Sequence, residues 1–397
     1  MRILYHHRTA ADDGQAVHIR ELQGAFRRLG HEVDEVALVK RTPATVRSKP
    51  SMIGKLADLA PGFVRELAEH GYDAAGRRAL RSAITNKRPD FLYERYALST
   101  ACGVEVASES RLPFVLEVNS PLVDEVARTR GLRFPGWARR KEDRVLRGAA
   151  VVCVVSGALS GWARSRGVDG ARILLTPNGV DLARFHPAAK RANLLASLGI
   201  PTKRIIGFTG FMRDWHRLDV VLEAFAAAHL DRLDAALLIV GDGPALPGLR
   251  RKAKDLGIEA HVRFTGQVPH EAIADHVRLF DVALVTAINP YASPLKLFEY
   301  LASGVASVVV DQPNLREVLE ADCARFVPEG DAKALAAALT GLLTDESERR
   351  RIAEAGRALL LERDYTWDGN ARRVVAAVAA VLAERGRASA NPNNPRL

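Results

Sequence analysis

The 397-residue sequence has no apolar run of the roughly 18 residues that a membrane-spanning helix needs. No longer apolar stretch follows its first residues, MRILY, so they indicate a first strand rather than a secretory signal. Cysteine is scarce: Cys102, Cys153 and Cys323 stand far apart in apolar surroundings. This pattern predicts buried free thiols and argues against a disulfide or a metal site. We therefore expect a cytoplasmic protein.

Acidic residues are few in the N-terminal half, which carries the whole excess of a formal net charge of +10. Residues 40–88 hold eleven Lys or Arg against four acids, and residues 128–147 hold eight against two. Such a field favours anionic lipid head groups or an acidic acceptor, although charge runs are ordinarily solvated surface. Peripheral contact with the inner face of an anionic membrane is therefore one expectation, and a nucleic-acid partner is not expected.

Residues 51–70 carry apolar side chains at nearly helical spacing between basic flanks. A helix pair packed on the N-terminal half is the first interpretation of this segment. A surface that rests on a membrane or receives an acceptor is the second.

Short apolar runs of strand length alternate with helical stretches along almost the whole chain. This alternation predicts parallel sheets covered by helices on both faces, and the chain is long enough for two such α/β domains. The predicted strands are residues 3–5, 33–39, 91–93, 114–118, 151–155, 205–209, 237–240, 262–264, 282–285 and 307–310.

The run NPYASPLKLFEYLASG at residues 289–304 carries the clearest functional signal. It predicts a loop that turns into a helix, with Ser293 as the cap and Pro294 at the first helical position. The first-turn amides and the helix dipole favour an anion, and Lys296 adds a positive charge. One turn further on, Glu299 can accept hydrogen bonds from two neighbouring hydroxyls of a ribose. A nucleotide-sugar would fit these groups, while an ordinary capped surface helix is the alternative.

An ordered set of motifs accompanies that run. In chain order they are GQAVHIREL (14–22), LGHEV (29–33), YERY (93–96), LEVNSP (116–121), TPNGVD (176–181), FTG (208–210), LLIVGDGP (237–244) and VRFTGQ (262–267). Together they resemble the GT4 family of retaining glycosyltransferases over about residues 1–385. The resemblance implies the GT-B fold, an α/β architecture of two doubly wound Rossmann-like domains facing a central cleft.

The resemblance also implies a domain division. Residues 1–188 would form an N-terminal Rossmann-like acceptor-binding domain, and residues 189–366 a C-terminal Rossmann-like domain that binds the nucleotide-sugar donor. Residues 367–386 would form a helix that packs back on the N-terminal domain. Residues 387–397 have no apolar anchor, so we expect a disordered tail.

The reaction implied is transfer of a sugar from a nucleotide-diphosphate donor, with a UDP-sugar favoured, to an acceptor hydroxyl with retention of configuration. The resemblance implies no metal and no cofactor beyond this co-substrate. No carboxylate pair is arranged as in glycoside hydrolases. Electrostatic stabilisation of the leaving diphosphate would then supply most of the rate.

The resemblance assigns several residues to the donor. Arg213 and His216 are the nearest counterparts of the cations that relatives place beside the diphosphate. Arginine can hold two phosphate oxygens in a fork, whereas a neutral histidine donates a single N–H. Gly14 allows the backbone to approach the diphosphate or the acceptor. The remaining predicted donor-binding residues are Ser293, Pro294, Leu295, Lys296, Glu299, Gly266 and Val268.

The predicted catalytic group is Asn119, Glu117 and Arg213. Asn119 stands where many family members have histidine, and it would position sugar hydroxyls because an amide cannot relay a proton. Glu117 should lie on the same side of its strand, either to bind the acceptor or as a buried, satisfied carboxylate. The family's usual carboxylate eight positions before Glu299 is missing, and Tyr291 in its place leaves the donor sugar open.

Two other functions fit the same residues. A nucleotide-sugar epimerase of this fold would convert the donor without an acceptor. A non-catalytic, membrane-recruited binding protein is permitted by the N-terminal positive charge and by Tyr291. The acceptor itself stays open among a lipid-linked sugar, a glycan and a small metabolite.

Overall fold

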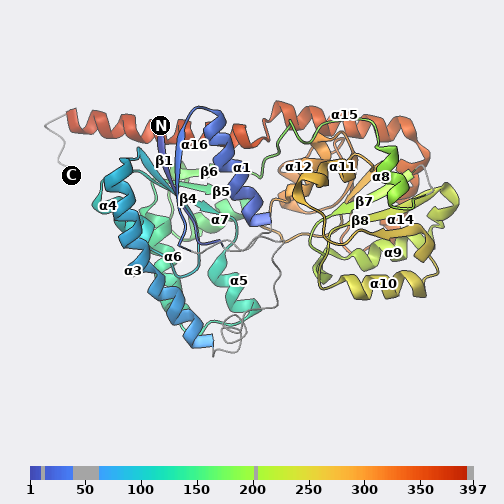
Figure 1. Cartoon of the computed structure of the whole chain (residues 1–397), viewed down its shortest axis with the longest axis horizontal. Helices are drawn as coiled ribbons and strands as arrows, with labels where there is room; N and C mark the ends of the chain where they lie inside the picture. The colour runs from blue at the N-terminus through green and yellow to red at the C-terminus, as the bar shows by residue number, and fades with distance from the viewer. Residues whose placement is uncertain (10–13, 39–61, 201–203, 391–397) are drawn as a thin grey trace. The chain divides into compact units, whose positions relative to one another are not determined.

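The computed structural model describes residues 1–9, 14–38, 62–200 and 204–390 (Figure 1). They form two compact units. The first unit combines Met1–Pro177 with the segment from Trp367 onward, and the second unit is Asn178–Thr366. Residues 391–397 of the predicted tail and residues 51–61 of the predicted helix pair lie outside the described residues.

The first unit is built on six parallel strands in the order β2-β1-β3-β4-β5-β6. Every residue of the three strands β3, β4 and β5 is buried, as expected for a parallel sheet with both faces covered. In sheet order the strands are β2 (Glu32–Val36), β1 (Arg2–His6), β3 (Phe91–Arg95), β4 (Phe114–Val118), β5 (Val151–Val154) and β6 (Ile173–Leu175).

The helices of the first unit divide between the two faces of this sheet. They are α1 (Gly14–Arg28), α3 (Gly62–Lys87), α4 (Cys102–Glu109), α5 (Leu122–Thr129), α6 (Pro135–Gly148), α7 (Gly157–Ser165) and α16 (Trp367–Ala390). The α16 helix packs on α1, where the rings of His18 and Trp367 lie 4.8 Å apart. Figure 1 shows α3, α4 and α6 gathered beside one another.

Alternation along β1, β3 and β4 sends neighbouring side chains to opposite faces of the sheet. The register pairs Tyr5 with Tyr93 and His6 with Glu94. Tyr5 and Tyr93 therefore point toward α1, while His6 and Glu94 point toward α3 and α4. This separation places two different buried polar groups on the two faces.

The second unit repeats the design with six parallel strands in the order β12-β11-β10-β7-β8-β9. Its strands are β7 (Arg204–Thr209), β8 (Ala235–Val240), β9 (Val262–Phe264), β10 (Val282–Val285), β11 (Ala306–Val310) and β12 (Arg325–Val327). Its helices are α8 (Ala192–Ser197), α9 (Leu218–Ala227), α10 (Leu246–Asp255), α11 (Ile273–Val277), α12 (Leu295–Ala302), α13 (Pro313–Arg316), α14 (Ala332–Thr344) and α15 (Glu346–Glu362).

Two hydrophobic clusters sandwich the sheet of the second unit. Leu238 and Val240 of β8 join the cluster on the α12 side, and Leu237 and Ile239 join the cluster beneath α9 and α14. Every residue of β8 is buried, so its sequence is continuously apolar rather than alternating.

Each sheet has a switch point, at which the order of strands reverses although all strands stay parallel. In the first unit this point lies between β1 and β3, and in the second between β7 and β10. Open α/β sheets bind ligands beyond the carboxyl ends of strands at such points. We therefore expect functional groups at the ends of β1 and β3 and in the loops after β7 and β10.

The predicted α/β architecture of parallel sheets is confirmed, and each of the ten predicted strands is present. The structure adds β6 and β12, two three-residue strands at sheet edges. The three cysteines are buried and free, as predicted. Within the described ranges, no helix combines the length and apolar character that crossing a bilayer requires.

Replacement of Gly207 in β7 by alanine is expected to destabilise the second unit. A Cβ atom there would lie 2.1 Å from the ring of Phe280, so the ring must move. We expect a loss of about 1–3 kcal/mol, the usual cost of overpacking, measured as a lower midpoint of urea unfolding. Gly248 in α10 is the control, because a Cβ there meets open space and Gly248→Ala should leave the midpoint unchanged or raised. Equal midpoints for the two variants would contradict this account.

Candidate functional site

Three glycines let the loops after β7 and β8 approach each other through their backbones. A Cβ at Gly241 would lie 2.1 Å from the carbonyl oxygen of Gly210, and one at Gly243 would lie 2.2 Å from that of Met212. Both glycines also have positive φ angles, +128° and +158°. The approach is fixed by the Met212 N–H, which donates to the Asp242 carbonyl at 2.8 Å. The two loops are therefore in direct backbone contact at these glycines.

The start of α12 differs from the predicted cap. Pro294 is the N-cap residue with an extended backbone, and no side chain caps the helix. The Ser293 hydroxyl instead accepts a bond from the Asn178 N–H at 3.0 Å. The prediction of Ser293 as cap and Pro294 as first helical residue was therefore wrong, because the loop around Asn178 recruits the hydroxyl. The amides of Leu295 and Lys296 consequently receive no side-chain cap.

Lys296 projects from this first turn toward the end of β7. Its Nζ lies 3.7 Å from the ring centroid of Phe208, and a Cβ at Gly210 would come within 3.0 Å of that nitrogen. Desolvation lowers the pKa of Lys296 to about 7, while the charge of Glu299 opposes the shift. A half-buried ammonium that readily loses its proton therefore stands at the helix start.

Glu299 lies one turn beyond Lys296 and is half-buried. The next residue, Tyr300, is buried, and its hydroxyl accepts a bond from the Thr209 N–H at 2.8 Å. This bond ties α12 to the end of β7. The structure thus brings Lys296, Glu299 and the uncapped helix start to one edge of the sheet.

The loop after β7 carries the other predicted cation. Arg213 is exposed, with its guanidinium carbon 5.1 Å from the ring centroid of Phe211. His216 is buried, and its Nδ1 accepts from the Arg213 N–H at 3.2 Å, so Nε2 carries the proton. Desolvation, followed by the charges of Lys296 and Arg213, lowers the pKa of His216 to about 2. His216 is therefore neutral and offers a single N–H.

The predicted base-pocket residues lie on the neighbouring strand ends. Gly266, with a φ angle of +72°, follows β9 and bridges to Gly241. Thr265 accepts a bond from the Gly241 N–H at 3.1 Å, and Val268 packs on the core below. Tyr291 is half-buried in the loop before α12, where its hydroxyl accepts a bond from the Asn289 amide at 3.4 Å.

In the first unit, Glu117 at the end of β4 is a buried hub with only 2% of its surface exposed. Its carboxylate is shared by donors from β1, β3 and α1 and from the residue that follows β4. These partners are the Tyr93 hydroxyl (2.7 Å), the Asn119 amide (2.5 Å), the Tyr5 hydroxyl (3.4 Å), His18 Nε2 (3.2 Å) and the Arg95 guanidinium. Of the two interpretations of Glu117 from the sequence, the structure fits the buried, satisfied carboxylate.

Burial alone would raise the pKa of Glu117, but the charges of His18 and Arg95 and the donated bonds lower it far below 4.5. Glu117 is thus an anion that orients its neighbours. The expected shared side of Glu117 and Asn119 is confirmed by their bond. Because Nδ2 of Asn119 is committed to Glu117, its side-chain oxygen is the atom left to accept a bond.

Gly14 lies exposed at the start of α1, one turn before His18. His18 and Arg95 are members of the Glu117 network that sequence reasoning missed. The alternation in YERY gave a usable signal, because it puts Tyr93 and Arg95 on the face that Glu117 occupies. Gly14, Glu117 and Asn119 belong to the first unit, whereas the other predicted site residues belong to the second.

Two family models match the chain. The model described as "Glycosyltransferase Family 4" matches residues 13–184, and the model described as "Glycosyl transferases group 1" matches residues 190–359.

Curated relatives include a "GDP-mannose-dependent alpha-(1-6)-phosphatidylinositol dimannoside mannosyltransferase" of Mycobacterium tuberculosis, 31% identical over 236 residues. That match covers 58% of each chain, so this chain spans less than two thirds of the relative. A "Phosphatidyl-myo-inositol mannosyltransferase" of Mycolicibacterium smegmatis is 28% identical over 89% of this chain and 86% of that protein.

Solved structures share the fold of the chain. HepE of Anabaena in complex with UDP has a TM-score of 0.71 and 16% identity, covering 96% of this chain and 100% of that chain. A glycosyltransferase from Rickettsia africae has a TM-score of 0.73 and 14% identity, covering 96% and 98%. At these identities the likeness supports the predicted GT-B fold alone.

Replacement of Glu117 by glutamine is expected to destabilise the first unit by about 3–5 kcal/mol, because it leaves buried cationic partners without their anion. The lowered pKa fixes the sign of the pH dependence. The stabilisation by Glu117 is fully present above its ordinary pKa of 4.5 and declines as the pH falls below that value. Urea midpoints of wild type and E117Q should therefore converge on acidification.

Glu109→Gln serves as the matched control, since the pair of Glu109 with Arg81 lies half-exposed on the surface. At neutral pH its urea midpoint should stay close to that of the wild type, because solvent screens an exposed ion pair. A gap between wild type and E117Q that persists unchanged into acid would refute the assignment of the stabilisation to the ionised carboxylate.

Proposed function

The chain belongs to the GT4 family of glycosyltransferases, and we propose that it moves a sugar from a nucleotide-diphosphate donor to an acceptor hydroxyl with retention of configuration. The observation that carries this proposal is the start of α12. Uncapped amides, the ammonium of Lys296 and, one turn on, the carboxylate of Glu299 meet at a single sheet edge. A diphosphate followed by a ribose matches this order of positive and then negative groups.

The leaving diphosphate is proposed to rest on the amino end of α12. Lys296 approaches it from the side of Gly210, and Arg213 and the Nε2–H of His216 come from the loop after β7. Such fixed donors and cations stabilise the charge that develops as the glycosidic bond to phosphate breaks. The neutral state of His216 makes it a hydrogen-bond donor to the diphosphate rather than a second cation.

The nucleoside is proposed to lie beside the loops after β7 and β8, whose backbones meet at the glycines. Glu299 accepts from the two ribose hydroxyls, and the backbone at Gly266 and Val268 lines the base. Asn119 is proposed to position a sugar hydroxyl with its free carbonyl oxygen, and Gly14 to admit a substrate beside the start of α1. In this scheme Glu117 is a positioning residue that orients Asn119.

The names of the relatives bear on both the donor and the acceptor. The sequence favours a UDP-sugar, whereas relatives named for GDP-mannose favour a GDP-sugar, so both nucleotides belong in the test. The relatives' names also favour a phosphatidylinositol-type lipid acceptor. Peripheral contact with an anionic membrane through the basic first unit would deliver such an acceptor. Part of the charge of residues 128–147 is already paired, since Arg139 contacts Asp124 and Arg144 contacts Glu105.

The proposal is tested by a thermal-shift panel of UDP- and GDP-linked sugars, because a ligand of the native state raises its stability. The donor that shifts the melting temperature is then incubated with the chain, with and without vesicles containing phosphatidylinositol, and the products are analysed. We expect a glycosylated lipid with retained configuration. Conversion of the donor sugar without any acceptor would identify an epimerase instead.

The same panel is run on Glu299→Ala. Loss of two ribose hydrogen bonds to a carboxylate should weaken nucleotide binding by about 1.5–3 kcal/mol, which is roughly 10- to 100-fold. Glu354→Ala removes an exposed carboxylate of α15 and should bind as the wild type does. If E299A and E354A bound UDP and GDP equally well, the ribose assignment would be wrong.

Binding of a nucleoside diphosphate is expected to gain from acidification through the titration of Lys296. The group is charged below its pKa of about 7, and an anion stabilises the charged form. The affinity advantage of wild type over Lys296→Met should therefore be largest below that pH and shrink above it, by up to about tenfold per pH unit. Isothermal titration calorimetry of both proteins across this range measures the difference.

The comparison with K296M removes the titration of the diphosphate itself, which both proteins share. An affinity ratio that stays constant from mildly acidic to alkaline pH would show that Lys296 does not bind the diphosphate as a titrating cation.

A further inference from the structure

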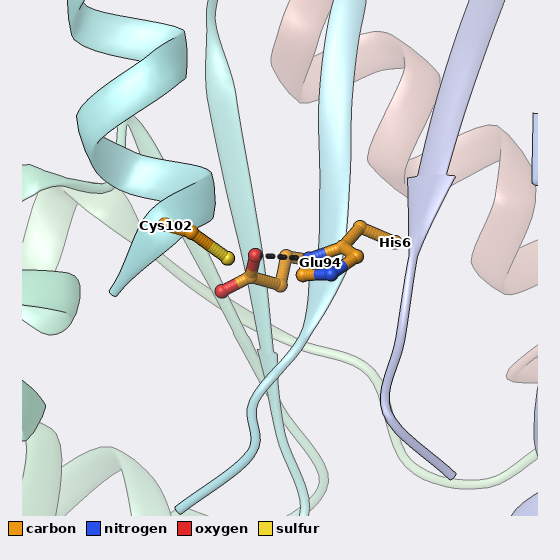
Figure 2. A group of neighbouring side chains, drawn as sticks. All are labelled: His6, Glu94 and Cys102. Atoms are coloured by element: carbon orange, nitrogen blue, oxygen red, sulfur yellow. Dashed lines mark hydrogen bonds and ion pairs between the residues drawn. The ribbon is translucent and has the colours of Figure 1, made fainter. Parts of the chain in front are cut away.

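His6, Glu94 and Cys102 converge inside the first unit (Figure 2). They lie on the face of the sheet away from Glu117, because Glu117 shares the face of Arg95 and not that of Glu94. His6 ends β1, Glu94 lies near the end of β3, and Cys102 begins α4. At most 1% of each residue is exposed. One donor atom from each lies within 4.8 Å of the other two, and Nδ1 of His6 is 2.5 Å from Oε2 of Glu94. Imidazole, carboxylate and thiolate are ligands that zinc accepts together.

One atom of this group has no partner. Oε1 of Glu94 is buried and forms no hydrogen bond within the described structure, although its sister oxygen is bonded to His6. A buried acceptor left unsatisfied destabilises the folded protein, because it has lost its hydrogen bonds to water without replacement. An ion between the three side chains would give this oxygen the ligand it lacks.

The other nitrogen of His6 is held as a ligand histidine is held. Nε2 of His6 lies 3.2 Å from the Tyr72 hydroxyl of α3. If Nε2 keeps its proton for that bond, the lone pair of Nδ1 points toward Glu94 and Cys102. Metal-bound histidines commonly engage their second nitrogen in this way, which fixes the ring and its tautomer.

Two glycines reserve the space that the ligands occupy. A Cβ at Gly103 would lie 1.9 Å from Oε2 of Glu94, and one at Gly76 would lie 2.6 Å from Sγ of Cys102. Neither glycine has a positive φ angle, so backbone conformation does not require either one. Their place in the sequence is explained by the room that the carboxylate and the thiol need.

We propose that His6, Glu94 and Cys102 form a zinc site of the first unit. Without metal, the group holds one proton between His6 and Glu94 and another on the Cys102 thiol. Zinc replaces these two protons, forms bonds to Nδ1, a carboxylate oxygen and Sγ, and leaves the net charge of the cluster unchanged. A fourth tetrahedral position is filled by water, as in other three-ligand zinc sites.

Neighbouring charges are compatible with this exchange. Asp73 of α3 accepts from the N–H groups of Ala101 and Cys102 and is paired with Lys141. It therefore caps α4 and is neutralised by its own cation.

The site is independent of the donor site in the second unit, so its test does not use activity. The full chain is freed of metal by a chelator, dialysed and titrated with Co²⁺, which reports thiolate ligation by a sulfur-to-cobalt absorption band. We expect one Co²⁺ per chain, displaced by Zn²⁺, with release of protons into weakly buffered solution. A wild-type chain with no saturable Co²⁺ band and no proton release would overturn the proposal.

Three variants separate this site from general thiol binding. Cys102→Ser should lose the band, whereas Cys153→Ser, which alters a buried thiol of β5, should keep it. Tyr72→Phe should keep the band but weaken metal affinity by about 10- to 100-fold, because the His6 ring loses its hydrogen bond to the Tyr72 hydroxyl.

Circular dichroism confirms folding of each variant, and Y72F serves as the test if C102S does not fold. A band that survives in C102S, disappears in C153S, or has unchanged affinity in Y72F contradicts the site.

Discussion

The order of the first unit depends on one buried negative charge. Glu117 of β4 binds donors from β1, β3 and α1 and from Asn119, so four elements meet on a single carboxylate. An isolated charge at this depth would be very costly, and it is tolerated because cations and hydroxyls surround it. The same contacts set the orientation of Asn119 and the start of α1. Glu117 therefore both stabilises the first unit and orients Asn119, a candidate site residue.

In the second unit, glycines make room for a positive charge at the end of β7. Gly210, Gly241 and Gly243 let backbone meet backbone, and the space left at Gly210 is occupied by the ammonium of Lys296. That ammonium is partly desolvated over Phe208, and the opposite charge that acts on it is Glu299. An anionic ligand would relieve the strain of a poorly hydrated cation, which is why this edge suits a diphosphate.

The sequence predicted the architecture well, because continuous apolar runs mark parallel buried strands regardless of their partners. It missed β6 and β12, two three-residue strands at sheet edges where fewer than three residues are fully buried. It also misplaced the cap of α12, because Ser293 is drawn to Asn178, a residue far away in sequence. The network of Glu117 and the cluster around Cys102 were hidden for the same reason. Their members come from separate strands and helices, and they meet only when the sheet register is set and the helices pack on it.

The path of the chain has a consequence for biosynthesis. The second unit is one continuous segment, whereas the first is completed only by α16, which packs beside α1 through His18 and Trp367. On the ribosome, the later half can therefore finish its core while the earlier half still waits for its last helix. During that interval the side of α1 that carries His18 is uncovered. Premature termination near residue 366 would thus leave the first half, not the second, without its closing helix.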